Sequence, residues 1–127
     1  IPALAKYRGE VIINPALSPD GTKVAFQIPG HGMWVINSDG TGLKSLGKGS
    51  NPSWMPDSRS IVYTVVSDNG HSYTASTLYG LDVVNGNGSV LVSANGLIPV
   101  TPAVSPDGRK VVFGDATDGS LYIVNLK

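Results

Sequence analysis

Residues 101–113 read TPAVSPDGRKVVF, and this stretch decides the fold because it encodes a strand, a tight turn and a second strand. The turn is Ser105-Pro-Asp-Gly108, in which proline presets φ, aspartate can bond to its own backbone and glycine tolerates a positive φ. Residues 110–113 are rich in β-branched and aromatic side chains, as strands are. The stretch therefore predicts a β-hairpin.

The same hairpin occurs twice more. Residues 14–26 read NPALSPDGTKVAF, which is nearly a copy, and residues 51–63 read NPSWMPDSRSIVY, which is a degenerate one. In the second copy Met55 replaces serine and Ser58 replaces glycine, so we expect a turn type there that needs no positive φ at Ser58. Three copies in 127 residues indicate a repeat protein.

Each hairpin is followed by a loop and by a third strand that contains an aromatic residue, over 33–37, 77–82 and 121–125. In the first two units an Asp-Gly or Asn-Gly turn and a fourth strand follow. Repeats of about 40 residues with four strands each are typical of propeller blades. No stretch shows a sustained helical period, so we expect no helix.

The sequence therefore predicts an all-β fold, a β-propeller with three blades of the four-stranded type per chain, equal to half of a six-bladed ring. The whole of 1–127 is one domain in this interpretation. Blade 1 covers 14–50, blade 2 covers 51–100, and blade 3 covers 101–127 without its outer strand. Residues 1–13 are interpreted as an N-terminal closing strand.

We expect a proline to begin the innermost strand of each blade. The three prolines are Pro15, Pro52 and Pro102. Apolar and aromatic residues that alternate along the strands should point inward, between blades. This predicted core consists of Leu17, Val24, Phe26, Trp34, Ile36, Trp54, Ile61, Tyr63, Tyr79, Val104, Val111, Phe113 and Tyr122.

The repeated pattern Pro-x-x-Ser-Pro-Asp-Gly-x-Lys-Val-x-Phe, followed by an aromatic strand and an Asp-Gly turn, resembles the TolB-like β-propeller repeat over 14–127. The same repeat builds the propellers of prolyl-oligopeptidase-like and tricorn-like peptidases. The resemblance implies a non-catalytic scaffold that binds a protein or a ligand, periplasmic or secreted in a bacterium. The alternatives are the propeller domain of such a peptidase and a metal-dependent lyase-like propeller, because one fold serves many functions.

The composition narrows the function further. The formal net charge is zero, which gives no electrostatic reason to bind nucleic acid or an anionic membrane. The chain has no cysteine, so thiolate chemistry, disulfides and cysteine-based zinc sites are excluded. The nucleophile elbow, the zincin pattern, the P-loop and the dinucleotide fingerprint are absent from the sequence. We expect no catalytic residue, no cofactor and no metal site, and hence no enzyme unless the chain is part of a longer one.

Three polar residues are the candidates for binding a ligand or a partner. His31 and His71 occupy equivalent loops between the second and third strands of their units, and Asp118 lies in the corresponding loop of the third unit. Histidines in equivalent loops could bind a metal or an anion, and solvent-exposed loop histidines are the simpler alternative. Loops carry function on rigid scaffolds, so 27–32, 67–76, 94–101 and 115–119 are the expected contact segments.

Three blades cannot close a propeller, which needs four to eight. The expected partner is therefore either a second copy, giving a homodimeric six-bladed ring, or the other half of a longer propeller. In the first alternative residues 4–8 of one chain complete blade 3 of the other. The identity of any further protein partner does not follow from the sequence, and no apolar run is long enough to span a bilayer.

Overall fold

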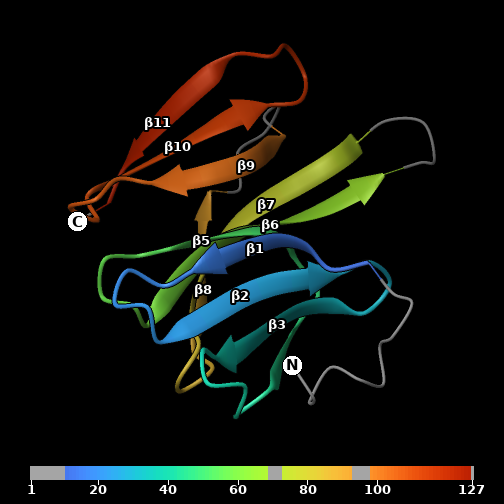
Figure 1. The fold of residues 1–127 in the computed structure, drawn as a ribbon. Helices are drawn as coiled ribbons and strands as arrows, with labels where there is room; N and C mark the ends of the chain where they lie inside the picture. Colours follow the sequence, from blue (N-terminus) through green and yellow to red (C-terminus); the bar gives the residue numbers. More distant parts are fainter. Residues whose placement is uncertain (1–10, 69–72, 93–97, 127) are drawn as a thin grey trace.

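The computed structural model describes residues 11–68, 73–92 and 98–126. These residues form β-strands and connecting segments only, arranged as three antiparallel sheets that stack side by side (Figure 1). Within the described residues no helix is long and apolar enough to cross a membrane. The all-β prediction and the propeller-type blades are therefore confirmed.

The sheets follow the three repeats in chain order, and we call them blades 1, 2 and 3. Blade 1 consists of β1 (Ile13–Leu17), β2 (Lys23–Ile28), β3 (Gly32–Asn37) and β4 (Lys44–Gly47). Blade 2 consists of β5 (Ser50–Trp54), β6 (Ser60–Asp68), β7 (Tyr73–Asp82) and β8 (Gly88–Val92). Blade 3 consists of β9 (Pro99–Val104), β10 (Lys110–Asp115) and β11 (Leu121–Asn125). Neighbouring strands in each sheet are consecutive in the chain.

The three blades share one register. The last residue of each first strand lies opposite the same position of the second strand, in the pairs Leu17–Val24, Trp54–Ile61 and Val104–Val111. The second and third strands pair through their aromatic residues, in Phe26–Trp34, Tyr63–Tyr79 and Phe113–Tyr122. Residues of different blades can therefore be compared position by position.

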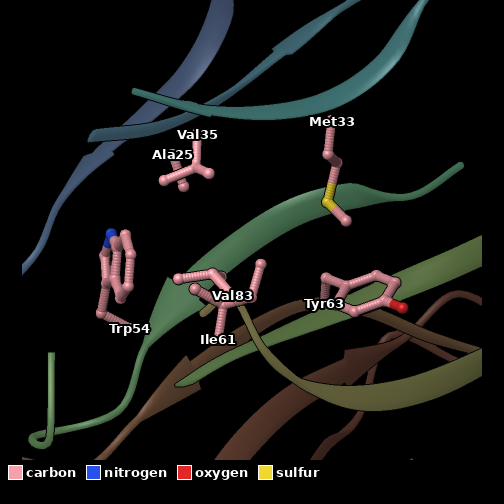
Figure 2. Packing of buried hydrophobic residues seen from close by; sticks show 7 residues of the cluster. All are labelled: Ala25, Met33, Val35, Trp54, Ile61, Tyr63 and Val83. Atoms are coloured by element: carbon pink, nitrogen blue, oxygen red, sulfur yellow. The ribbon is translucent and has the colours of Figure 1, made fainter. Parts of the chain in front are cut away.

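The core lies between the blades, because alternate residues of each strand point to opposite faces of the sheet. Between blades 1 and 2, Ala25, Met33 and Val35 of the first sheet face residues of the second (Figure 2). The facing residues are Trp54, Ile61, Tyr63 and Val83, all of them buried. The Tyr63 and Tyr79 rings stack with centroids 5.7 Å apart.

The interface between blades 2 and 3 repeats this arrangement one blade further along. Val62 and Leu78 of blade 2 pack against Val111 and Phe113 of blade 3. Phe113 stacks on Tyr122 at the same 5.7 Å and with the same 17° between ring planes as the tyrosine pair of blade 2. A stacked pair that spans the second and third strands therefore covers the preceding blade at both interfaces.

Most of the predicted core is buried or half-buried, but Leu17 is not. Its side chain is 63% exposed, so the prediction for Leu17 is wrong. The reason is its position in the stack. The equivalent residues Trp54 and Val104 pack against the preceding blade, with the Trp54 indole N–H donating to the Ala16 carbonyl at 2.7 Å. No described segment precedes blade 1 to cover Leu17 in the same way.

The prolines also lie deeper in their strands than expected. The first strands begin at Ile13, Ser50 and Pro99, and each pairs with a register shift around its proline. Proline has no N–H to give to a ladder, so it fits where a bulge interrupts the pairing. The residues before the three prolines all have positive φ: Asn14 at 51°, Asn51 at 55° and Thr101 at 47°. This bulge is part of the repeat.

The turn of the second hairpin corrects another expectation. Ser58 has a φ of 56°, so the turn keeps the left-handed residue that glycine supplies in the other two. Gly21 and Gly108 occupy the equivalent positions at 75° and 73°. The expectation of a turn without positive φ at Ser58 is therefore wrong. A serine fits this position because its hydroxyl accepts a hydrogen bond from the Asp20 backbone N–H at 2.9 Å.

Two parts of the sequence interpretation fall outside the described residues. The N-terminal closing strand lies mainly in 1–10, and His71 lies in 69–72. The strands that flank His71 are longer than predicted, because β6 reaches Asp68 and β7 begins at Tyr73.

Candidate ligand-binding cleft

The blades have two distinct ends. The hairpin turns and the Asp-Gly or Asn-Gly turns lie at one end, which we call the turn end. The loops between second and third strands, together with the connections from blade to blade, lie at the other, which we call the connector end. This follows from the antiparallel order of consecutive strands.

A cleft of about 550 Å³ opens at the connector end, where blades 1 and 2 meet. The loop between β2 and β3 forms one side, the connection between β4 and β5 forms another, and β6 forms the third. The lining residues are Gln27, Ile28, Pro29, Gly30, His31, Gly32, Gly47, Lys48, Gly49, Ser50, Val65 and Val66. Of the sequence-predicted binding residues, the cleft contains His31.

The His31 loop is held in place by its own backbone and by a tryptophan. The backbone N–H of His31 donates to the Ile28 carbonyl at 2.8 Å, which closes a tight turn through Gly30. Gly30 has a φ of 84°, a conformation that favours glycine. The indole N–H of Trp34 donates to the His31 carbonyl at 3.1 Å. The aromatic residue of β3 therefore positions this loop.

The side chain of Gln27 joins the two blades next to the cleft. Its Oε1 accepts a hydrogen bond from Asn14 Nδ2 at 2.5 Å and another from the Asn51 backbone N–H at 2.8 Å. Gln27 is 8% exposed. The two residues that it contacts, Asn14 and Asn51, have positive φ and directly precede the first-strand prolines of blades 1 and 2. The amide therefore fixes the two bulges relative to each other.

The other connection is tightly packed against the His31 loop. A side chain on Gly32 would overlap the carbonyl oxygen of Gly47, and one on Gly49 would collide with Met33 and Tyr63. Backbone therefore approaches backbone at this point, which only glycine allows. Four glycines therefore contribute main chain to the lining of the cleft, beside the side chains of its other residues.

The chemical character of the cleft is polar with an apolar side. Lys48 and His31 are the ionisable side chains among its lining residues, and no Asp or Glu is among them. Gln27 and Ser50 add uncharged hydrogen-bonding groups, and Val65 contributes an apolar side chain from β6. Such a surface can bind backbone amides, carbonyls or carboxylates.

Asp118 is not part of this cleft. It lies in the loop between β10 and β11 of blade 3, where its Oδ1 accepts a hydrogen bond from the Ser120 backbone N–H at 2.8 Å. The described residues contain no group of three His, Asp or Glu side chains that could hold a metal ion. The structure thus assigns His31 and Asp118 to separate loops of different blades.

Asp115 lies in the expected contact segment 115–119, but its role in fixing the connection into blade 3 was not predicted from the sequence. Its buried carboxylate accepts hydrogen bonds from the Ile98 backbone N–H at 2.9 Å and from the Thr117 hydroxyl at 2.7 Å. The bond from Ile98, followed by those from Thr117, keeps the pKa of Asp115 below its usual value of 3.8. The sequence does contain a signal for this role. Asp115 stands at the repeat position that Ile28 and Val65 occupy in the other two units.

Comparisons with known proteins bear on the fold of the whole chain. No family model matches the sequence. A protein from Chlorobium chlorochromatii named Protein TolB homolog is 42% identical over 119 residues, which cover 89% of this chain and 25% of that protein. The chain therefore spans about a quarter of the length of this curated relative.

Solved structures show the same fold. A putative TolB from Agrobacterium tumefaciens superimposes with a TM-score of 0.68 at 23% identity, covering 87% of this chain and 40% of the other. The β-propeller domain of the Trilobed protease from Pyrococcus furiosus superimposes with the same TM-score at 14% identity, covering 91% and 39%. Three repeats in sequence, three stacked antiparallel sheets and these likenesses together identify the chain as a TolB-like β-propeller segment.

Proposed function

We propose that this chain is a non-catalytic binding scaffold and that it binds an extended segment of a partner protein in the cleft between blades 1 and 2. The observation that carries the proposal is how the cleft is built. Two loops from neighbouring blades form it, and hydrogen bonds through Gln27 and Trp34 hold them in place. Binding sites commonly consist of loops that a rigid scaffold positions in this way.

The lining supports a peptide as the ligand. Main chain at Gly30, Gly32 and Gly47 offers backbone donors and acceptors, while Val65 can contact an apolar side chain. Lys48 favours a partner segment that carries a carboxylate. We also propose a periplasmic or secreted location, which the TolB likeness supports.

A second candidate is the propeller of a peptidase, supported by the fold likeness to the Trilobed protease propeller. The metal-dependent lyase-like alternative requires His71, which lies outside the described residues. The two alternatives make different demands on the protein. A hydrolase region encoded in the same gene would favour the peptidase, and a metal bound by untagged protein would favour the lyase-like site.

The test of the scaffold proposal is selection of peptides from a displayed random library on the purified chain. Binding of the selected peptides is then measured for Lys48→Ala and Val65→Ala in the cleft, and for Val84→Ala at the turn end as a matched control. Val84 is 54% exposed in the turn after β7, so its truncation removes no packed side chain. We expect at least about tenfold weaker binding for the cleft variants, equal to about 1.4 kcal/mol, and unchanged binding for the control. Peptides whose affinity is unaffected by both cleft variants would contradict the proposal.

A further inference from the structure

The connection from β7 to β8 contains two Asn-Gly dipeptides in succession, Asn85-Gly86 and Asn87-Gly88. Of the dipeptides that begin with asparagine, Asn-Gly is the one in which the following backbone nitrogen attacks the side-chain amide most readily, because glycine has no side chain to hinder the approach. The two dipeptides differ in their hydrogen bonds. We propose that Asn87 is a site of spontaneous deamidation in the folded protein and that the hydrogen bonds of the turn protect Asn85.

Asn85 is held at both of the groups that the reaction needs. Its Oδ1 accepts a hydrogen bond from the Asn87 backbone N–H at 2.8 Å, which fixes the side-chain amide. The nitrogen that would attack this amide belongs to Gly86, and its N–H donates to the Asp82 carbonyl at 2.9 Å. Ring closure at Asn85 therefore has to break a hydrogen bond on each reacting group.

Asn87 has an exposed side chain, and no hydrogen bond joins its side-chain amide to another described residue. The register of the ladder leaves the attacking nitrogen available as well. The Asp82 N–H donates to the Asn87 carbonyl at 2.8 Å, and hydrogen-bonded and non-hydrogen-bonded pairs alternate along an antiparallel ladder. The next pair, Leu81–Gly88, is therefore non-hydrogen-bonded, and the Gly88 N–H points away from β7. Among the described residues β8 is an edge strand of its sheet, so this N–H faces no further strand.

The reaction needs only water. The Gly88 nitrogen gives up its proton to a base in solution and forms a bond to Cγ of Asn87, while the bond from Cγ to Nδ2 breaks and the amide leaves as ammonia. Water then opens the cyclic succinimide at one of its two carbonyls. Opening at Cγ gives aspartate, and opening at the backbone carbonyl gives isoaspartate, in which the main chain runs through the former side chain.

Both products should weaken the entry into β8. Aspartate at position 87 places a second carboxylate opposite Asp82, and like charges directly opposite each other destabilise a sheet. Isoaspartate lengthens the main chain by one CH₂ group just before the Leu81–Gly88 pair, which disturbs the register of β8. The modified protein should therefore unfold at a lower urea concentration than the unmodified one.

The experiment is incubation of the purified chain in mildly alkaline water labelled with a heavy oxygen isotope, followed by digestion and fragment mass spectrometry. Hydrolysis of the succinimide adds the label to the modified residue, so each Asn-Gly dipeptide is scored separately. We expect Asn87 to become labelled at least about tenfold faster than Asn85, because only Asn85 must break two hydrogen bonds. The dipeptides at 69–70 and 95–96 lie outside the described residues and do not enter the comparison.

Two controls tie the difference to the fold. In concentrated urea the turn is lost, and the labelling rates of Asn85 and Asn87 should become similar. Asn87→Ser should remove the fast site and leave Asn85 slow. Labelling of Asn85 as fast as that of Asn87 in the folded chain would overturn the proposal. Labelling of Asn87 only after unfolding would overturn it too, since the fold would then protect both sites.

Discussion

The hydroxyl of Ser58 accepts a hydrogen bond from the backbone N–H of Asp20 at 2.9 Å, and this bond joins the hairpin turns of blades 1 and 2. The hairpin turns of blades 2 and 3 also touch, through Gly108. A Cβ atom added to Gly108 would lie 3.0 Å from Pro56 Cδ, so this glycine packs directly on the turn of blade 2. The left-handed residues of the second and third turns, Ser58 and Gly108, therefore contact the turn of the preceding blade.

Replacing Ser58 tests this contact. Ser58→Ala keeps a Cβ in a left-handed conformation and removes the acceptor, so we expect a loss of about 1–2 kcal/mol in the free energy of unfolding. Ser58→Gly removes the same acceptor but relieves the backbone, which costs a non-glycine residue about 1–2 kcal/mol. The glycine variant should therefore be at least as stable as the alanine variant in urea unfolding. A glycine variant that is clearly the less stable of the two would show that Ser58 is not strained.

The amide of Gln27 should matter more than the side chain at the same position in blade 2. Gln27→Leu would leave the Asn51 N–H without its acceptor, and we expect a loss of about 1–3 kcal/mol. The equivalent Thr64 bonds to the Ser50 carbonyl at 3.4 Å, which is long, so Thr64→Val should cost about 1 kcal/mol or less. Chemical denaturation of the two variants measures the difference. Equal losses would mean that the bridge between the bulges adds no stability.

Two glycines on third strands should respond in opposite directions to the same substitution. Gly80 replaces the Val35 of blade 1 and borders a cavity of about 340 Å³ next to blade 3. A methyl group there would meet Leu91 Cδ1 at 3.5 Å, an ordinary contact, so Gly80→Ala should stabilise by about 0.4–1 kcal/mol. Gly32→Ala should destabilise by about 1–3 kcal/mol, since φ is 80° and the methyl would overlap the Gly47 carbonyl. Thermal unfolding of both variants tests the pair, and a stabilised Gly32→Ala would contradict the close approach of the two loops.

The stability of the fold should decrease in acid through its turn carboxylates. The Thr22 hydroxyl, followed by the Thr22 backbone N–H, lowers the pKa of Asp20 from 3.8 to about 2. Because the folded pKa is lower than the unfolded one, the stabilisation is complete above the unfolded value of 3.8 and disappears as the pH falls through about 2. Asp20→Asn should therefore make the unfolding midpoint less dependent on pH in this window. An unchanged acid profile in that variant would show that Asp20 does not contribute.

The architecture could be predicted from the sequence because the same strand–turn–strand pattern occurs three times. Hairpin turns, aromatic third strands and the three-stranded blade 3 all follow from local patterns, and the structure confirms them. Leu17 could not be predicted from its own unit, because its equivalents Trp54 and Val104 are buried by a neighbouring blade. Whether a blade face is covered is a property of the stack, which alternation within one strand does not reveal.

The candidate site was predicted only in part for a related reason. The loop of His31 was identified as a contact segment, and it lines the cleft. Gln27 was not identified, since a single glutamine in a strand gives no signal until Asn14 and Asn51 are brought beside it. The left-handed residues before the prolines were also missed, although asparagine at two of the three positions tolerates that conformation better than most residues.

The most direct test of peptide binding in the cleft is a nuclear magnetic resonance titration of the chain with a selected peptide, followed through glycine amides at both ends of the blades. We expect the amides of Gly30, Gly32, Gly47 and Gly49, which line the cleft, to shift with a common saturation curve. The amides of Gly21, Gly40 and Gly108 at the turn end should stay in place. Shifts confined to the turn-end glycines, with none in the cleft, would contradict binding at this site.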